Sequence, residues 1–274
     1  MLRAVNLIPK TKQTAKHSQP LYTLRSKRRR QTPTLHSTQT TRPQQERKNN
    51  MKYQNIVKAE FVSRPNRFIA KVKINGKEEI CHVKNTGRLR ELLIPGVCVY
   101  VQKCTSPGRK TPYDLIAVSH MGETVNIDSQ APNKVFGEWV CSYFEDVTYV
   151  KPEAKYKNSR FDFYVETKTR KIFIEIKGVT LIENGTALFP DAPTERGVKH
   201  LNELCECIDD GYEAYVFFVI KKENITRFCP NRKTHPEFAD ALSDAKKKGV
   251  NIMAVNCRVE PDLLEIRDFA HTDI

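Results

Sequence analysis

Hydrophobic and polar side chains alternate in two neighbouring runs near the middle of the chain. In residues 160–163 and 173–177 the apolar side chains recur at every second position, which is the period of a β-strand. The stretch between them, residues 166–171, is polar and suits a short reversal between antiparallel strands. The pattern predicts a β-hairpin with one charged face and one apolar face, the apolar face being made of Phe161, Phe163, Ile174 and Ile176.

The length of the reversal decides which residues of the hairpin face each other. With an even number of loop residues centred on positions 168 and 169, Asp162 falls opposite Glu175, and the apolar residues pair in the same register. Opposed residues on one face have Cβ atoms roughly 4.5–5.5 Å apart, so two carboxylates there could share one divalent cation. The competing interpretation is that Asp162, Glu175 and Lys177 form an ordinary solvated strand face, because charged residues usually do.

An amphipathic helix is expected after the hairpin, following a turn marked by two prolines. Its polar side would carry Arg196, Lys199 and His200, at the three- and four-residue spacing of neighbours on a helix. Gly197 costs a helix interior about 1 kcal/mol relative to Ala, which indicates a close approach by backbone or ligand, with a permissive first turn as the alternative. The apolar stripe would be formed by Val198, Leu201, Leu204, Cys205 and Ile208.

Short β-rich runs dominate the chain between residues 51 and 128. Asn75-Gly76 lies between the second and third runs and is a strong hairpin signal. Between the third and fourth runs, residues 85–92 predict a loop that enters a short helix, which Pro95 and Gly96 end. Five short strands in so short a segment are typical of a small barrel, and they are expected at residues 56–63, 68–74, 79–83, 97–103 and 114–119.

The remaining segments alternate between helix and strand patterns. A helical pattern begins around residues 128–133, and another covers residues 236–248. Residues 214–220 are continuously apolar, as expected for a strand buried on both faces, and residues 250–256 predict a further strand. Together with the hairpin and the central helix, this order predicts a mixed sheet with flanking helices.

Several long motifs resemble one protein family. They are NRF, NTGRLRELLIPG, SRFDF, EIKGVTL and FPDAPTERGVKHL. From about Met51 to about Val255 the chain is similar to the sugar fermentation stimulation protein A family of bacteria and archaea. The resemblance implies a mixed α/β architecture, with an OB-fold-like β-barrel over residues 51–128 and a restriction-endonuclease-like domain of the PD-(D/E)xK class over residues 129–274.

The resemblance also implies roles for the hairpin residues. In that nuclease class an Asp and the Glu of an ExK motif bind a divalent metal, and the Lys serves the attacking water; the matching positions are Asp162, Glu175 and Lys177. Glu153, nine residues before Asp162, is a candidate for a further metal ligand, and an ordinary surface Glu is the alternative. Carboxylate ligands favour Mg²⁺ or Mn²⁺ over zinc.

Nucleic acid, DNA or RNA or both, is the expected partner. Arginines close to Phe68 and Tyr100 suggest base stacking beside phosphate contacts, as in OB folds that hold single strands. Equally, these aromatic residues belong to the barrel core and the arginines form a solvated rim. The residues expected to contact nucleic acid are Arg64, Arg67, Arg88, Arg196, Lys199 and His200.

The net charge of +14 is unevenly distributed along the chain. Residues 1–50 carry 12 Lys and Arg and one acid, so residues 51–274 carry 34 bases and 31 acids, a net charge of only +3. A nucleic-acid site in the later part must therefore be a local patch. The composition of residues 1–50 predicts a disordered basic tail, and a start assigned too far upstream of Met51 is an equal alternative.

The eight cysteines show no CxxC pair, and most of them are expected to be reduced core residues of a soluble cytoplasmic protein. A metal site at Cys205 and Cys207 near His200 is the less favoured alternative, because zinc sites use wider cysteine spacing. No apolar run is long enough to span a bilayer, so no membrane association is expected.

The favoured function is a Mg²⁺- or Mn²⁺-dependent nuclease that hydrolyses phosphodiester bonds. The alternative, from the same family resemblance, is a non-cleaving DNA-binding regulator of sugar (maltose) metabolism genes. A pure binder has no use for two opposed carboxylates, because they repel DNA unless a cation neutralises them. The preference for DNA or RNA, the strandedness, the sequence specificity and self-association remain open.

Overall fold

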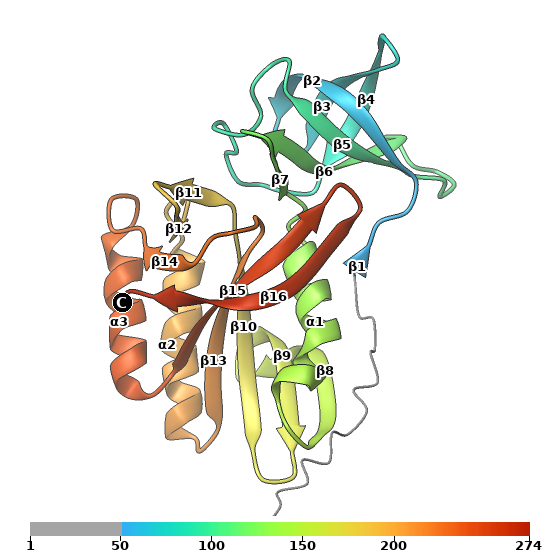
Figure 1. Cartoon of the computed structure of the whole chain (residues 1–274). Coiled ribbons are helices and arrows are strands. Elements are labelled where there is room, and N and C mark those ends of the chain that lie inside the picture. Colours follow the sequence, from blue (N-terminus) through green and yellow to red (C-terminus); the bar gives the residue numbers. More distant parts are fainter. Residues whose placement is uncertain (1–50) are drawn as a thin grey trace, which may run out of the picture. The chain divides into compact units, whose positions relative to one another are not determined.

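Residues 51–274 are described by a computed structural model and form two β-sheets with three α-helices (Figure 1). One sheet closes into a barrel of the OB type, and the other is a large mixed sheet in an α/β domain. Both parts of the fold expected from the sequence are thereby confirmed. The predictions for residues 1–50 lie outside the described residues.

The barrel sheet has the strand order β4-β3-β2-β5-β6-β7, and β4 also pairs in parallel with β6. This extra pairing closes five strands into a ring and leaves β7 as an extension. Asn75 and Gly76 both have positive φ, as a two-residue hairpin turn requires. The strands are β2 (Ile56–Asn66), β3 (Ile69–Ile74), β4 (Lys77–Val83), β5 (Cys98–Lys103), β6 (Tyr113–His120) and β7 (Glu123–Asn126).

The short helix expected after residue 85 is absent from the described residues. The chain makes only one turn there, closed by a hydrogen bond of 2.9 Å from Leu93 N to Leu89 O. The guanidinium of Arg64 donates hydrogen bonds to the carbonyl oxygens of Asn85, Gly87 and Arg88. In a helix these oxygens would instead accept hydrogen bonds from backbone N–H groups. A contact from a distant strand has therefore overruled the local helical preference.

The α/β domain is built on a sheet with the order β11-β12-β14-β16-β15-β13-β10-β9-β8, and β1 pairs with β16. Strands β10, β13 and β15 are parallel neighbours, whereas β8, β9 and β10 are antiparallel. The elements are β1 (Met51–Lys52), α1 (Ala131–Tyr143), β8 (Val147–Tyr156), β9 (Ser159–Thr167), β10 (Lys171–Val179), β11 (Leu181–Glu183), β12 (Thr186–Phe189), α2 (Glu195–Asp209), β13 (Glu213–Ile220), β14 (Arg227–Pro230), α3 (Pro236–Lys248), β15 (Asn251–Glu260) and β16 (Leu263–Thr272).

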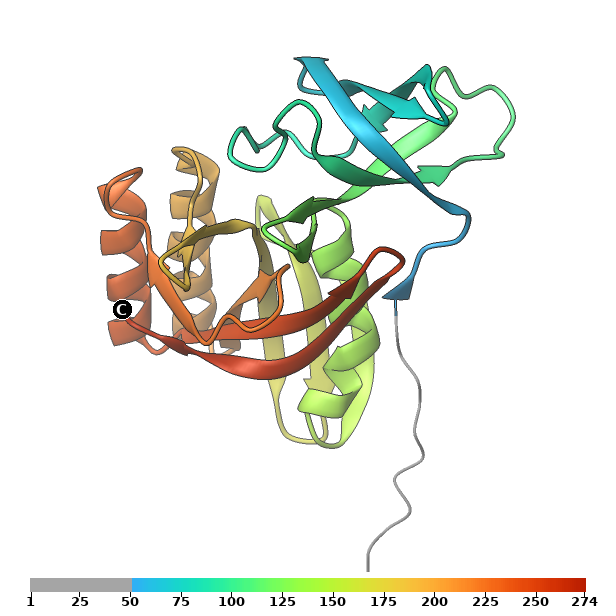
Figure 2. The same cartoon turned by 45° about the horizontal axis from the view of Figure 1, so that its top comes forward.

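Helix α1 covers one face of the sheet, and α2 and α3 cover the other (Figures 1 and 2). Successive residues of β13 therefore enter different cores: Phe217 packs on the α1 side and Phe218 on the α2 side. This explains the continuous apolar run at residues 214–220, because a strand buried on both faces has no polar side. The three helices and the hairpin agree with the sequence prediction, whereas no strand was predicted at β1, β7, β8, β11, β12, β14 or β16.

One prediction about the hairpin is wrong: Phe161 and Phe163 do not share a face. Phe163 packs against Phe136 of α1, with ring centroids 5.2 Å apart, whereas Phe161 packs against Phe173 in the core under α2, at 5.6 Å. The change of face lies beside a local irregularity of the sheet. Glu153, in the neighbouring strand β8, has a positive φ. Such irregularities redirect side chains, and they often lie next to functional sites.

All eight cysteines are free. Cys81, Cys207 and Cys257 are buried as expected, but Cys141 is exposed and the other four are half-buried. In the part of the chain that the structure describes, no group of three or more His, Cys, Asp or Glu side chains could hold a metal ion. No helix within residues 51–274 is long and apolar enough to cross a membrane.

Candidate active site

The hairpin of β9 and β10 has the register that the sequence predicts. Lys171 pairs with Glu166 and Ile174 pairs with Phe163, as predicted, and the regular pairing ends there, with Asp162 and Glu175 as the next residues along the two strands. Here the side chain replaces the main chain as acceptor, since Asp162 Oδ2 accepts a hydrogen bond of 2.7 Å from the backbone N–H of Ile176. The Asp162 carboxylate is therefore anchored directly to the strand that carries Glu175.

Glu175 lies in the middle of a buried polar cluster and is only 4% exposed. Its Oε1 accepts a hydrogen bond of 2.6 Å from Lys177 Nζ and a second one from His200 Nδ1. Its Oε2 is buried and has no hydrogen-bond partner among the described residues. A buried oxygen without a hydrogen bond destabilises the fold unless another group binds it. The cluster can therefore accept one more ligand.

Asn133, in the first turns of α1, completes the surroundings of Asp162. Its Nδ2 donates a hydrogen bond of 2.6 Å to Asp162 Oδ1, so both carboxylate oxygens of Asp162 have partners. No motif in the sequence marks this residue. Its spacing from Asp162 carries no signal, because the contact depends on how α1 packs against the sheet.

The two carboxyls differ in their pKa values. Burial raises the pKa of Asp162 above its usual value, and the negative charge of Glu175 adds to the rise. Burial also opposes ionisation of Glu175, but the hydrogen bond from His200 and the charge of Lys177 outweigh it and lower the pKa of Glu175. Asp162 is therefore the member of the pair that gains most from a nearby cation.

His200 lies on the buried face of α2, so its expected position on the polar side of the helix is wrong. The residue is 5% exposed, and Arg196 Nε donates a hydrogen bond of 3.2 Å to its Nε2. Since Nε2 accepts, Nδ1 carries the proton and donates to Glu175. Both ring nitrogens are thus engaged by Arg196 and Glu175.

Helix α2 begins at a side-chain cap that places its first turn beside the cluster. Thr194 Oγ1 accepts a hydrogen bond of 3.1 Å from Gly197 N. A Cβ on Gly197 would lie 2.8 Å from the Thr194 side chain and 3.1 Å from Phe238 Cε2, so the close approach comes from protein side chains. Lys199 is exposed, with its Nζ 3.6 Å from Glu203 Oε1, and it stays at the surface.

Glu153 does not join the carboxylate cluster. The β8–β9 register, with Pro152 opposite Phe163 and Ala154 opposite Phe161, places it across from Asp162. However, its side chain is 71% exposed and forms an ion pair of 2.9 Å with Arg160. The structure therefore brings together Asp162, Glu175 and Lys177 and leaves Glu153 at the surface.

Arginines of the barrel line an open cavity of about 450 Å³. Arg67, Arg88 and Arg90 are exposed there. Arg64 differs, because its two terminal nitrogens donate to four carbonyl oxygens, including that of Arg67 at 2.8 Å. Arg64 holds the loop in place, and its neighbours remain available for an anion. Of the nearby aromatic residues, Tyr100 packs against the core and Phe68 is exposed.

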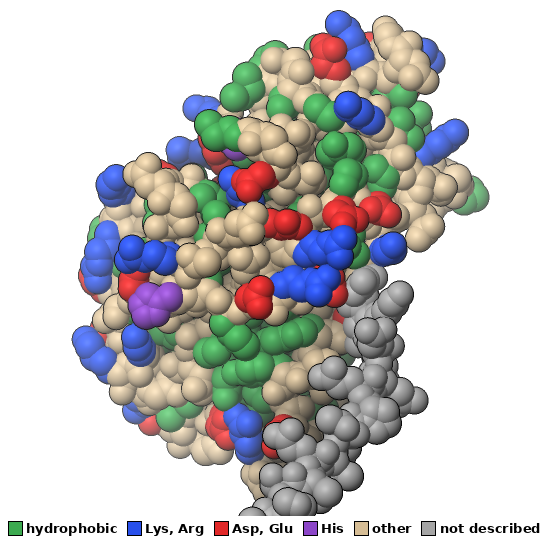
Figure 3. Space-filling view, viewed as in Figure 1, with side chains coloured by type: hydrophobic (Ala, Val, Ile, Leu, Met, Phe, Trp, Pro, Cys, Tyr) green, Lys and Arg blue, Asp and Glu red, His purple; other side chains and the backbone are tan. Residues whose placement is uncertain are grey.

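The surface of the described residues is electrically mixed. Figure 3 shows basic and acidic side chains interspersed over one face, in line with a net charge of only +3 for residues 51–274. The basic lining of the arginine cavity is thus a local feature. The carboxylate cluster lies towards the carboxyl end of β10, where α/β sheets commonly bind ligands.

An OB barrel followed by an α/β domain with a buried Asp–Glu–Lys cluster defines a two-domain protein with a restriction-endonuclease-like fold. Comparison with known families agrees: the pattern of the "SfsA N-terminal OB domain" matches residues 62–127, and that of the "Sugar fermentation stimulation protein RE domain" matches residues 130–263. The chain belongs to the sugar fermentation stimulation protein (SfsA) family.

Relatives extend over most of the chain. Sugar fermentation stimulation protein homologs of Clostridium beijerinckii and of Desulfitobacterium hafniense strain Y51 are each 60% identical to it, over 221 and 220 residues. These regions are 80% of this chain and 98% and 96% of the two relatives. The solved structure of Pyrococcus furiosus SfsA in complex with Ca²⁺ has a TM-score of 0.74 and 30% identity, and the match covers 82% of this chain and 98% of that chain.

Proposed function

We propose that the chain is a divalent-metal-dependent nuclease that hydrolyses phosphodiester bonds in nucleic acid. The observation that carries the proposal is the buried pair of Asp162 and Glu175, in which Glu175 Oε2 has no partner among the described residues. A stable protein core would not keep this arrangement without a use for it, because like charges on facing strands repel each other. The Ca²⁺ in the archaeal relative supports a cation-binding role for the family fold.

The residues present fit a hard cation. Asp162 and Glu175 would hold Mg²⁺ or Mn²⁺ through carboxylate oxygens, and the raised pKa of Asp162 indicates that the charge of Lys177 does not offset burial and the charge of Glu175. Two carboxylates leave room for water and phosphate oxygens, which is the usual coordination of Mg²⁺ in phosphoryl-transfer sites. Such an ion lowers the pKa of a bound water and polarises the phosphate.

The protein residues around the pair position the reacting groups. His200 donates to Glu175 Oε1 and orients the second oxygen, and Asn133 does the same for Asp162. Lys177, whose side chain is 13% exposed, is close enough to hold the attacking water or to stabilise negative charge on the phosphate oxygens. Arg67, Arg88 and Lys199 would hold neighbouring phosphates, because they are exposed.

A direct test is cleavage of labelled single- and double-stranded DNA and RNA in Mg²⁺, Mn²⁺, Ca²⁺ or EDTA. Glu175→Gln keeps the shape of the side chain but removes its charge, so metal affinity should fall together with the cleavage rate, the rate by at least about 100-fold. Lys177→Met should retain metal affinity, measured by calorimetry, and lower only turnover.

Glu153→Gln is the matched control, since this carboxylate also faces Asp162 in the register but points to solvent. It should cleave at the wild-type rate. Full activity of Glu175→Gln at every metal concentration would refute the nuclease assignment. Binding of nucleic acid without any cleavage by the wild type would instead favour the regulator.

A further inference from the structure

A second cavity, of about 300 Å³, lies at the carboxyl ends of β10 and β13. Its walls are the barrel segment from Asn85 to Gly87, the segment from Phe189 to Thr194, and residues at the carboxyl ends of β10 and β13. It shares Thr86, Gly87 and Ala192 with the arginine cavity, and its Gly178 directly follows Lys177. The second cavity therefore adjoins the arginine cavity, and one of its walls is the part of β10 that follows Lys177.

The most unusual group in this cavity is the ammonium of Lys221. The residue is 2% exposed, and its Nζ donates a hydrogen bond of 3.1 Å to Asp128 O. Within residues 51–274 it has no carboxylate at ion-pair distance, so further N–H donors remain without a protein partner. Burial lowers the pKa of Lys221 to about 8, which shows how little the surroundings compensate for its charge.

Asp191 places a carboxylate in the same cavity. Its Oδ2 lies 2.9 Å from the position that a Cβ on Gly87 would take, and its charge acts on Lys221 without forming an ion pair. A phosphate in this space would be repelled by Asp191, and a cation would be repelled by Lys221. A nucleobase edge suits both groups, because it offers hydrogen-bond acceptors and N–H donors side by side.

Resting on the proposed function, we propose that this cavity holds one unpaired nucleobase of the bound strand. Lys221 donates to an acceptor on the base edge, and Asp191 accepts from a base N–H. A volume of about 300 Å³ is at the lower end of small-ligand sites, which suits a single nucleotide and not a stacked pair. An unpaired strand enters at a lower cost than a duplex, since no base pair has to open.

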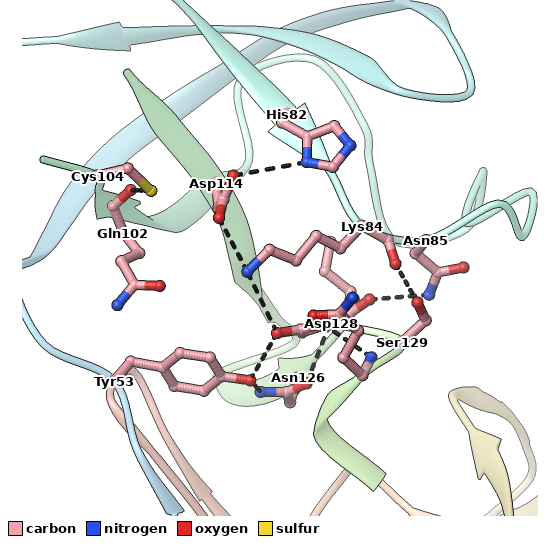
Figure 4. Close-up of polar contacts among 12 residues, drawn as sticks. Tyr53, His82, Lys84, Asn85, Gln102, Cys104, Asp114, Asn126, Asp128 and Ser129 are labelled. Atoms are coloured by element: carbon pink, nitrogen blue, oxygen red, sulfur yellow. Dashed lines mark hydrogen bonds and ion pairs between the residues drawn. The ribbon is translucent and has the colours of Figure 1, made fainter. Parts of the chain in front are cut away.

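The walls of the cavity are held in place before any strand binds. Figure 4 shows Asn85 and Ser129 tied to neighbouring segments, Asn85 Nδ2 to Ile127 O at 2.8 Å and Ser129 Oγ to Lys84 O. A Cβ on Gly178 would lie 2.8 Å from Pro132 Cγ and 3.5 Å from Lys221 Cε, so glycine keeps this wall open. Little ordering is then required on binding, which favours affinity.

The test compares two strands of equal length and charge by fluorescence anisotropy in EDTA. One is a single-stranded 12-mer with all its bases, and the other is abasic at every position, so both present the same phosphates. Wild type should bind the strand with bases more tightly. In Lys221→Met and in Asp191→Asn, the ratio of the two affinities should fall about tenfold, the magnitude of one polar base contact.

Lys222→Met is the control, because this neighbouring lysine pairs with Glu123 at 2.9 Å and does not line the cavity. It should keep the wild-type ratio. Asp191→Asn provides a second test if Lys221→Met melts at a lower temperature, since Asp191 is only half-buried. An unchanged ratio in Asp191→Asn together with an unchanged ratio in folded Lys221→Met would overturn the base pocket.

The outcome is independent of the nuclease assignment. A wild type that cleaves nothing in any metal, yet shows the base preference and its loss in both variants, would refute the proposed function and leave the base pocket standing. Cleavage by the wild type, together with an affinity ratio that neither variant changes, would support the proposed function and overturn the base pocket. Equal affinity of the wild type for both strands would show that the protein reads phosphates alone, and it would also overturn the pocket.

Discussion

Two buried polar clusters of this molecule use similar residues and differ in how completely those residues are satisfied. At the junction of barrel and α1, Asp114 contacts Lys84 at 2.9 Å and also Arg109, and Asp128 accepts from the Tyr53 hydroxyl at 3.2 Å (Figure 4). We call this the junction cluster. In the carboxylate cluster of the α/β domain, by contrast, one buried oxygen of Glu175 has no hydrogen-bond partner within residues 51–274.

The pKa values of the two clusters show the same difference. Burial opposes ionisation of Asp114, but Lys84 and Arg109 outweigh it and hold its pKa below the usual value. Among the described residues Asp162 forms no ion pair, and burial and Glu175 raise its pKa despite the charge of Lys177. A buried carboxyl with its own cations stabilises the fold, whereas a buried pair of carboxyls that lacks one charge is a candidate for ligand binding.

The same substitution in both clusters should have opposite effects. Asp162→Asn should reduce the cleavage rate by about 100- to 1,000-fold, because it removes a charge that acts on the reacting groups. Its melting temperature should fall less than that of Asp114→Asn, since the raised pKa shows that the folded protein does not favour the charge, and the amide loses only one of the two hydrogen bonds that Asp162 accepts. Cleavage assays and calorimetric melting measure the two effects. Strong destabilisation would show that the cluster is structural.

Asp114→Asn should show the reverse pattern. It leaves Lys84 and Arg109 without their carboxylate and should lower the free energy of unfolding by about 3 kcal/mol. For a fold of this size, that corresponds to a fall of roughly 6–12 °C in melting temperature. The cleavage rate per folded molecule should be unchanged. A normal melting curve for this variant would remove the contrast between the clusters.

The pH dependence of stability extends the comparison to Lys221. This residue borders the junction cluster through Asp128, and within residues 51–274 it has no carboxylate partner. Its pKa falls from 10.5 in the unfolded chain to about 8 in the fold, so between these values the unfolded chain binds more protons. Stability should therefore rise with pH across this window, by up to about 3 kcal/mol relative to Lys221→Met. Denaturant unfolding at pH 7.5, 9 and 10.5 measures this difference, and a parallel course of the two proteins would contradict it.

Local features of the chain were enough to predict most elements and the central register. The polar reversal between β9 and β10 predicted the pairing of Glu166 with Lys171 and of Phe163 with Ile174, because loop length is a property of one short segment. The same holds for the barrel hairpin at Asn75-Gly76 and for α3, which spans Pro236–Lys248 as predicted. The exposure of Glu153 could not be predicted from local features. Its backbone has a positive φ, and at such an irregular position the register does not reveal the direction of the side chain.

Tertiary packing decided the surroundings of the site. Asn133 reaches Asp162 across 29 residues of sequence, and His200 reaches Glu175 across 25, because helices on opposite faces of one sheet meet the same strands. Arg64 binds loop carbonyls, and Lys221 meets Asp128 across 93 residues, although the sequence alone shows both only as basic residues. Long-range contacts of this kind depend on how elements pack, and neither hydrophobic period nor motif spacing contains that information.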